Sequence, residues 1–150
     1  MTGEEEIAKQ VLDAAFKVHT ALGPGLLESV YEAALALELR RQGLSVVQQQ
    51  PIQVSYEGIP LEIGFRADLI VNEAVLIELK SVESLLPVHK KTATSYLRLI
   101  PLKLGFLINF NEASLKDGIV RVVNGVEGKP FLPVDLRKGA ERQTGQPPRY

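Results

Sequence analysis

The stretch from Gly64 to Lys80, GFRADLIVNEAVLIELK, constrains the fold more than any other part of the chain. It predicts two strands joined by a tight turn at Asn72-Glu73, with charges inside otherwise apolar strands. Successive side chains of a strand point to opposite faces. The first strand then carries Leu61, Ile63, Phe65 and Ala67 on one face and Glu62, Gly64, Arg66 and Asp68 on the other. The second carries Val75, Ile77 and Leu79 on one face and Ala74, Leu76, Glu78 and Lys80 on the other.

Asp68, Glu78 and Lys80 therefore form a polar group with a chemical interpretation. Two carboxylates on one side of a sheet can hold a hard cation such as Mg²⁺, and the main-chain carbonyl of Leu79 is a further candidate ligand. Lys80 could orient a metal-bound water or offset charge on a phosphate. The alternative is a pair of solvated charges, with Asp68 as an ordinary strand-end residue. By itself the spacing leaves both open.

Composition narrows the classes of site. The chain has 150 residues, enough for one domain with a core. It contains no cysteine, which excludes disulfides, thiolate zinc sites and cysteine nucleophiles, and only two histidines, so carboxylates are the expected metal ligands. The net charge of −1 argues against a protein that coats nucleic acid non-specifically, but is compatible with a nuclease.

The N-terminus, MTGEEEIAKQ, is acidic and precedes no apolar run of the kind found in secretory signals. No stretch approaches the roughly 20 apolar residues that a membrane span needs. We expect no membrane association and a cytoplasmic location.

Two helices are expected in the first third of the chain, over Glu4–Leu22 and Leu26–Gln42, separated by Gly23-Pro24-Gly25. One stripe of the second helix contains Tyr31, Leu35 and Leu39 but begins with Glu28. An unpaired buried charge is costly. Glu28 therefore needs a metal or basic partner, unless solvent and the positive helix end suffice.

Strands follow at Val46–Gln50 and Ile52–Tyr56, with Pro51 interrupting them or marking a sheet edge. The turn Glu57-Gly58 leads into the strand that ends at Asp68, so we expect an antiparallel meander.

Pro87 is a suitable first residue for a third helix, which should continue to about Ile100. We expect it to have an inward face of Val88, Thr92, Tyr96 and Leu99 and an outer face of Lys90, Lys91, Thr94 and Arg98. The basic face suits a phosphate backbone. The alternative is an ordinary solvated helix surface.

Two further strands are expected at Lys103–Phe110 and Ile119–Val123, with a turn at Asp117-Gly118 between them. The order of elements predicts an α/β fold, a mixed central β-sheet flanked by helices. The domain should span residues 1–136, and the polar segment 137–150 should be a disordered tail.

Several of these features together resemble a known family. Residues 25–31, GLLESVY, match Gly-x-x-Glu-x-x-Tyr, the signature of the GxxExxY proteins, a group within the PD-(D/E)XK nuclease superfamily. The resemblance continues through Asp68, Glu78-Leu79-Lys80, Tyr96-Leu97 and residues 105–110, in the same order. It covers roughly residues 5 to 125, nearly all of the expected domain.

The resemblance implies a restriction-endonuclease-like core in which Glu28, Asp68, Glu78 and Lys80 meet as catalytic residues. Glu28, Asp68, Glu78 and the carbonyl of Leu79 would hold Mg²⁺ or Mn²⁺. Tyr31 would pack beside Glu28 or form a hydrogen bond with it, and Gly25 would permit a tight turn into the helix.

The resemblance also implies that the third helix contacts substrate through Lys90, Lys91, Thr92 and Tyr96. Relatives commonly carry glutamine where this chain has Thr92. The shorter threonine implies a reduced contact with substrate or water.

The leading hypothesis is a metal-dependent nuclease acting on DNA, and dimerisation is common among nucleases of this fold. One alternative is a non-catalytic module that binds nucleic acid or protein on a nuclease-like fold. The other is a metal-dependent hydrolase of a small phosphorylated molecule.

Overall fold

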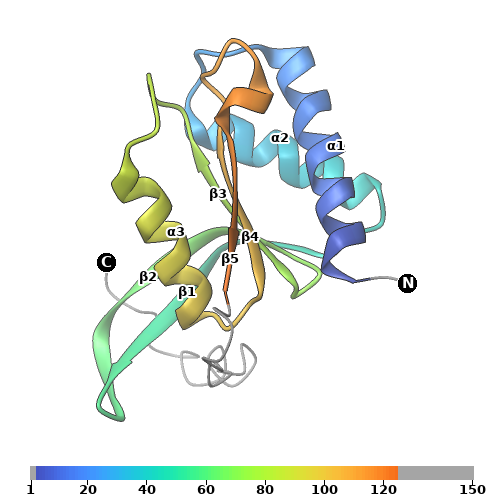
Figure 1. Cartoon of the computed structure of the whole chain (residues 1–150). Coiled ribbons are helices and arrows are strands. Elements are labelled where there is room, and N and C mark those ends of the chain that lie inside the picture. The colour runs from blue at the N-terminus through green and yellow to red at the C-terminus, as the bar shows by residue number, and fades with distance from the viewer. Residues whose placement is uncertain (1–2, 125–150) are drawn as a thin grey trace.

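The computed structural model describes residues 3–124. These residues form α1 (Glu4–Leu22), α2 (Glu28–Arg41), β1 (Val46–Tyr56), β2 (Ile59–Val71), β3 (Val75–Lys80), α3 (Pro87–Leu99), β4 (Leu104–Asn109), the short 3-10 helix η1 (Leu115–Gly118) and β5 (Ile119–Val123). One five-stranded sheet has the order β1-β2-β3-β4-β5. β3 and β4 are parallel, and the other neighbours are antiparallel. α1 and α2 cover one face of the sheet and α3 covers the other (Figure 1). The predicted mixed sheet flanked by helices is confirmed.

The first two helices follow from apolar spacing and from the glycines between them. α1 has the predicted bounds, with acidic residues in its first turn and Gly23 at its C-terminal end. α2 begins two residues later than predicted, because Gly25 has a φ of 98° and Leu27 is still extended. The stripe of Tyr31, Leu35 and Leu39 is fully buried. Glu28, in contrast, is exposed at the first turn of α2.

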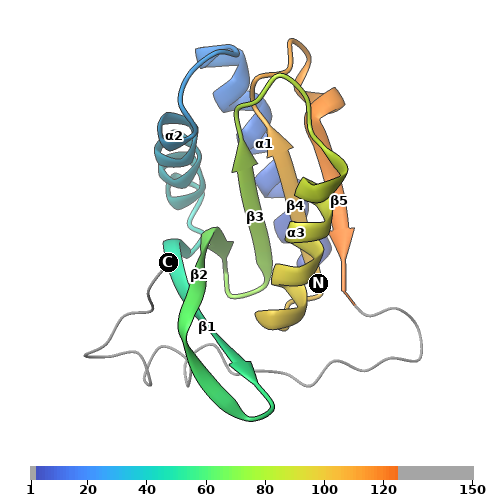
Figure 2. The same ribbon diagram turned by 90° about the vertical axis from the view of Figure 1, so that its left-hand side faces the viewer.

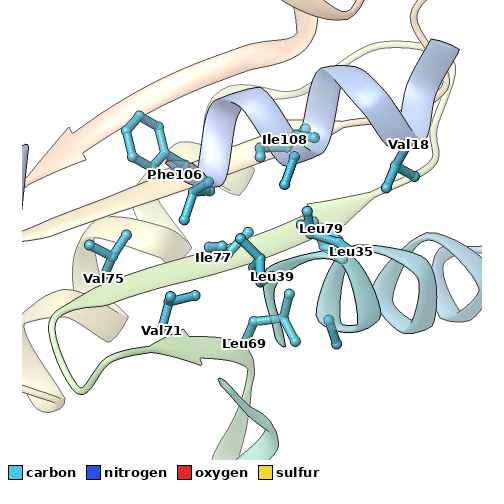
Figure 3. Packing of buried hydrophobic residues seen from close by; sticks show 14 of the residues in the cluster. Val18, Leu35, Leu39, Leu69, Val71, Val75, Ile77, Leu79, Phe106 and Ile108 are labelled. Carbon is cyan, nitrogen blue, oxygen red and sulfur yellow. The ribbon is translucent and has the colours of Figure 1, made fainter. Parts of the chain in front are cut away.

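The larger core lies between the sheet and the pair α1 and α2. Figure 3 shows Leu35 and Leu39 of α2 beside Leu69, Ile77 and Leu79 of the strands. Burying one such side chain contributes about 1.5–3 kcal/mol. This layer therefore anchors both helices to the strand β3.

A second core lies beneath α3, and here the predicted inward face is wrong at Val88 and Thr92. Ala93 and Leu97 are the buried residues of the helix, while Val88 is 55% exposed and Thr92 is also exposed. Tyr96 and Leu99 are partly buried at the margin. α3 crosses β4 over Gly105, where an added Cβ would lie 3.2 Å from the Leu97 side chain. The close approach favours small Ala93 on the inner face.

β4 is buried along its whole length because helices cover both faces of the sheet at this point. It is two residues shorter than predicted, whereas β5 has the predicted bounds. The predicted turn at Asp117-Gly118 lies within η1.

β1 and β2 form a long hairpin that extends beyond the helix-covered part of the sheet (Figure 2). Pro51 does not divide β1, since β1 is an edge strand and can accommodate a residue without an N–H. The turn at Glu57-Gly58 is present, with positive φ at both residues. β2 continues three residues past Asp68.

The predicted apolar face of β2 is buried only near the base of the hairpin. Phe65 and Ala67 are buried, whereas Leu61 is 39% and Ile63 is 65% exposed. The reason is that β2 pairs with β3 only from Leu69 to Val71, so the outer part of the hairpin has no sheet beside it.

The predicted tail, residues 137–150, lies outside the described residues, and the domain boundary at 136 stays a prediction. Between residues 3 and 124, no helix combines the length and apolar character needed to cross a membrane.

Candidate functional site

Asp68 and Glu78 lie opposite each other where β2 and β3 separate. The last paired residues are Leu69 and Ile77, and beyond them side chains continue the connection between the strands. The main-chain N–H of Asp68 donates to Glu78 Oε2 at 2.9 Å, and the N–H of Leu79 donates to Asp68 Oδ2 at 2.8 Å. Each carboxylate is thus held by the main chain of the other strand.

This arrangement makes both carboxylates harder to ionise. Burial, followed by the charge of Asp68, raises the pKa of Glu78 to about 8. Burial also raises the pKa of Asp68, against the hydrogen bonds from Leu79 and Gln49 that lower it. Binding a proton or a cation would therefore favour the pair in this buried setting.

Lys80 is two residues beyond Glu78 on the same face of β3 and is partly buried. Its ammonium group is near enough to lower the pKa of Glu78, although less than burial and Asp68 raise it. The main chain of Lys80 is fixed by the residue directly after β4, since the Lys80 carbonyl accepts a hydrogen bond from Phe110 N at 2.9 Å. The structure thus brings Asp68, Glu78 and Lys80 together at the end of β3.

Glu28 lies near the site formed by Asp68, Glu78 and Lys80, because Tyr31 anchors the loop before α2. The Tyr31 hydroxyl donates to the carbonyl of Gly23 at 2.5 Å and accepts from Leu26 N at 3.0 Å. Ser81 Oγ, directly after Lys80, donates to the carbonyl of Leu26 at 2.6 Å. These bonds hold the start of α2 near the end of β3.

Of the two contacts expected between Tyr31 and Glu28, packing or a hydrogen bond, the hydrogen bond is replaced by these main-chain bonds. The Tyr31 ring stacks on Phe110 at 4.6 Å. Glu28 contributes the smallest of the effects that raise the pKa of Asp68. In residues 3–124, no three His, Asp or Glu side chains are grouped closely enough to hold a metal ion. Glu28 is therefore near Asp68 without joining it and Glu78 in one ligand cluster.

Two site residues were missed from the sequence, Glu32 and Gln49. Gln49 Nε2 donates to Glu32 Oε1 at 2.6 Å and to Asp68 Oδ1 at 3.2 Å. The charge of Glu32 also acts to raise the pKa of both Asp68 and Glu78. The available signals were the spacing of four between Glu28 and Glu32, which puts them on one helix face, and the run Gln48-Gln49-Gln50 inside a strand.

α3 presents two different groups of predicted substrate residues. The ring of Tyr96 stacks on Phe65 at 3.8 Å, and burial, then the charges of Glu78 and Asp68, raise the pKa of its hydroxyl. Tyr96 is therefore on the side of the carboxylates. Lys90, Lys91 and Thr92 are exposed.

A shallow hollow of about 520 Å³ lies along the exposed side of α3. Its lining residues are Pro87, Lys90, Lys91, Thr94, Ser95 and Arg98. The basic face predicted for this helix is therefore a real surface feature, to which Thr92 and Tyr96 do not contribute.

The donor set fits a hard divalent cation. Asp68 and Glu78 supply carboxylate oxygens, the donors that Mg²⁺ and Mn²⁺ prefer. Burial is the main cause that raises the pKa of each carboxyl, and nearby positive charge would lower it. A divalent cation held by Asp68 and Glu78 would supply positive charge of this kind.

Comparison with known proteins assigns the chain to a family. Residues 5–122 match the family model described as PD-(D/E)XK nuclease superfamily. No curated protein matches the chain. A solved structure titled "Crystal structure of SSO0001" is 20% identical over 79% of this chain, with a TM-score of 0.45, and this chain covers 59% of its length. The match to the family model spans nearly all of the described residues, including the whole sheet except the last residue of β5. The chain therefore belongs to the PD-(D/E)XK nuclease superfamily and has its restriction-endonuclease-like α/β fold.

Proposed function

We propose that this protein is a Mg²⁺- or Mn²⁺-dependent nuclease that hydrolyses phosphodiester bonds of DNA. The observation that carries the proposal is the crossed pair of Asp68 and Glu78 beside Lys80. Membership in a superfamily of nucleases supports it. We also propose that the chain belongs to the GxxExxY group, supported by the use of Gly25 and Tyr31 to place the start of α2.

Asp68 and Glu78 would hold the cation, with Glu28 and the carbonyl of Leu79 as additional ligands in the complex with substrate. A bound cation supplies a Lewis acid that offsets phosphate charge and makes water easier to deprotonate. The chain itself keeps both carboxylates oriented through the N–H groups of the opposite strands. This fixed orientation avoids the cost of ordering the ligands during the reaction.

Lys80 would orient the attacking water and stabilise the negative charge that grows on the phosphate oxygens. Its position on β3 suits both roles, since it lies on the same face as Glu78. Removing a preorganised charge of this kind costs about 10²–10³-fold in rate.

The substrate would approach between the carboxylate pair and α3. Lys90 and Lys91 would contact the phosphate backbone, and Tyr96 would contact the substrate near the carboxylates, with Thr92 as a weaker contact. The position of the Tyr96 ring supports the part of this path next to the carboxylates. The basic hollow on the exposed side of α3 would contact the phosphate backbone farther from the carboxylates. A cytoplasmic location and a homodimer that cuts both strands complete the proposal.

The test is cleavage of labelled single- and double-stranded DNA and RNA in Mn²⁺, in Mg²⁺ and in EDTA. The proposal requires metal-dependent cleavage of a DNA substrate that EDTA abolishes. A folded protein that cuts nothing under any condition would contradict it.

A non-catalytic binding module is the second candidate. It is favoured by one observation, that Glu28 does not complete a three-carboxylate cluster in residues 3–124. Retained binding of DNA without cleavage, unchanged by Mn²⁺, would support this candidate over the nuclease.

A further inference from the structure

Gln49 has a main-chain conformation that is rare for residues other than glycine inside a strand. Its φ is 51°, in the left-handed region. It lies in β1 opposite Asp68, and this pair is absent from the strand register although Gln48↔Leu69 and Gln50↔Ala67 are present. A strained main chain persists only where its surroundings hold it. The contacts of the Gln49 side chain identify those surroundings.

The side-chain amide nitrogen of Gln49 bridges two carboxylates. It donates to Glu32 Oε1 at 2.6 Å and to Asp68 Oδ1 at 3.2 Å. Because an amide group has two N–H donors, both bonds can form together. The other oxygen of Asp68 accepts from Leu79 N at 2.8 Å. Both oxygens of Asp68 are therefore fixed, one from β3 and one from β1.

Resting on the nuclease function proposed above, we propose that Gln49 is a positioning residue for the cation site. Gln49 fixes the orientation of the Asp68 carboxylate. Glu32 in turn fixes the orientation of the Gln49 amide, because a carboxylate accepts hydrogen bonds and therefore requires the amide nitrogen, not the amide oxygen, to face it. A carboxylate oxygen has lone pairs for both a hydrogen bond and a cation. The bond to Asp68 can thus persist when the site is loaded.

The competing interpretation is that Gln49 only fastens α2 to β1. Gln48 distinguishes the two interpretations, because its side chain contacts the same Glu32 carboxylate from the neighbouring position in β1. Its Nε2 donates to Glu32 Oε2 at 3.1 Å, and its Oε1 accepts from Arg40 Nη1 at 3.1 Å. Among the hydrogen bonds of the described residues, those of the Gln48 side chain go to α2 and none goes to Asp68. Gln48 is therefore a matched control.

The experiment compares the full chain with Gln49→Gly and Gln48→Gly by thermal unfolding over a series of MnCl₂ concentrations. Glycine tolerates the left-handed conformation at position 49, so the first variant retains the fold. Loss of a hydrogen-bonding partner of a metal ligand typically costs about 10–100-fold in metal affinity. We expect the Mn²⁺ concentration at half-maximal rise in Tm to increase at least about tenfold in Gln49→Gly. In Gln48→Gly it should stay near the parent value.

Three results would overturn the inference, and they differ in what else they affect. An unchanged Mn²⁺ midpoint in Gln49→Gly would remove the positioning role and leave the nuclease proposal intact. An equal increase in both variants would assign the effect to the attachment of α2. A parent chain whose Tm does not respond to Mn²⁺ would remove the cation site itself, and the inference with it.

Discussion

At the scale of single residues, Glu78 shows how this fold prepares a carboxylate for a cation. Burial, followed by the charge of Asp68, raises the pKa of Glu78 to about 8, and the nearby Lys80 offsets only part of this rise. Near neutral pH the cation-free site therefore holds a proton that a divalent cation would displace. Release of that proton would couple cation binding to pH.

The first prediction concerns the stability of the cation-free protein against pH. The pKa of Glu78 is raised from 4.5 to about 8, so the folded chain binds more protons than the unfolded chain between these values. Stability from this group is present at low pH and is lost as pH rises toward 8. In EDTA, Tm should therefore fall from about pH 5 to about pH 8 by more in the parent than in Glu78→Gln. Parallel Tm curves for the two proteins would refute this account of the pair.

The second prediction concerns the anchor at Tyr31. Tyr31→Phe keeps the ring that stacks on Phe110 but removes the hydroxyl bonds to Gly23 and Leu26. Two hydrogen bonds to part-buried main-chain groups together contribute about 1–3 kcal/mol. Urea unfolding should show a loss of this size, with little change in Tyr56→Phe, whose side chain is 66% exposed. Equal stability of Tyr31→Phe and the parent would show that the loop does not depend on the hydroxyl.

At the scale of elements, the position of α3 depends on how closely it approaches β4. At Gly105 an added Cβ would lie 3.1 Å from the carbonyl oxygen of Leu76 and 3.2 Å from the Leu97 side chain. The contact with Leu76 involves main chain, which yields little. A larger residue would therefore move α3, and Tyr96 with it, relative to the carboxylate pair.

The third prediction follows from this contact. Gly105→Ala should destabilise the protein by about 1–3 kcal/mol through overpacking. Gly3→Ala is the control, because a Cβ at Gly3 has no atom within 4 Å and its φ of −114° suits any residue. Denaturant unfolding measures both. A Gly105→Ala variant as stable as the parent would show that α3 can shift without cost.

At the scale of the whole molecule, local patterns were enough to predict the elements and their order. α1 and β5 have the predicted bounds because their apolar periodicity and the glycines beside them act locally. The grouping of Asp68, Glu78 and Lys80 was also accessible, since alternation along a hairpin determines which side chains share a face.

The features of the fold and of the site that the sequence did not predict depend on contacts between distant parts of the chain. The inner face of α3 is set by the space above Gly105, which periodicity does not reveal. The left-handed conformation of Gln49 and its bridge to Glu32 require three elements to meet. Glu28 is exposed because the loop that Tyr31 closes holds the start of α2 at the surface. The apolar residues on the same helix stripe therefore led to a prediction of more burial than the structure has.

The most direct test of the central claim is the rate at which Lys80→Ala cleaves labelled DNA in Mn²⁺, relative to the parent and to Lys103→Ala. Lys103 is an exposed lysine just before β4, whereas Lys80 is at the end of the parallel strand β3. The two variants thus lose the same charge at opposite ends of the sheet. We expect Lys80→Ala to lose about 10²-fold or more in rate while keeping its Tm, with Lys103→Ala close to the parent. Cleavage by Lys80→Ala at the parent rate would contradict the assignment of catalysis to this site.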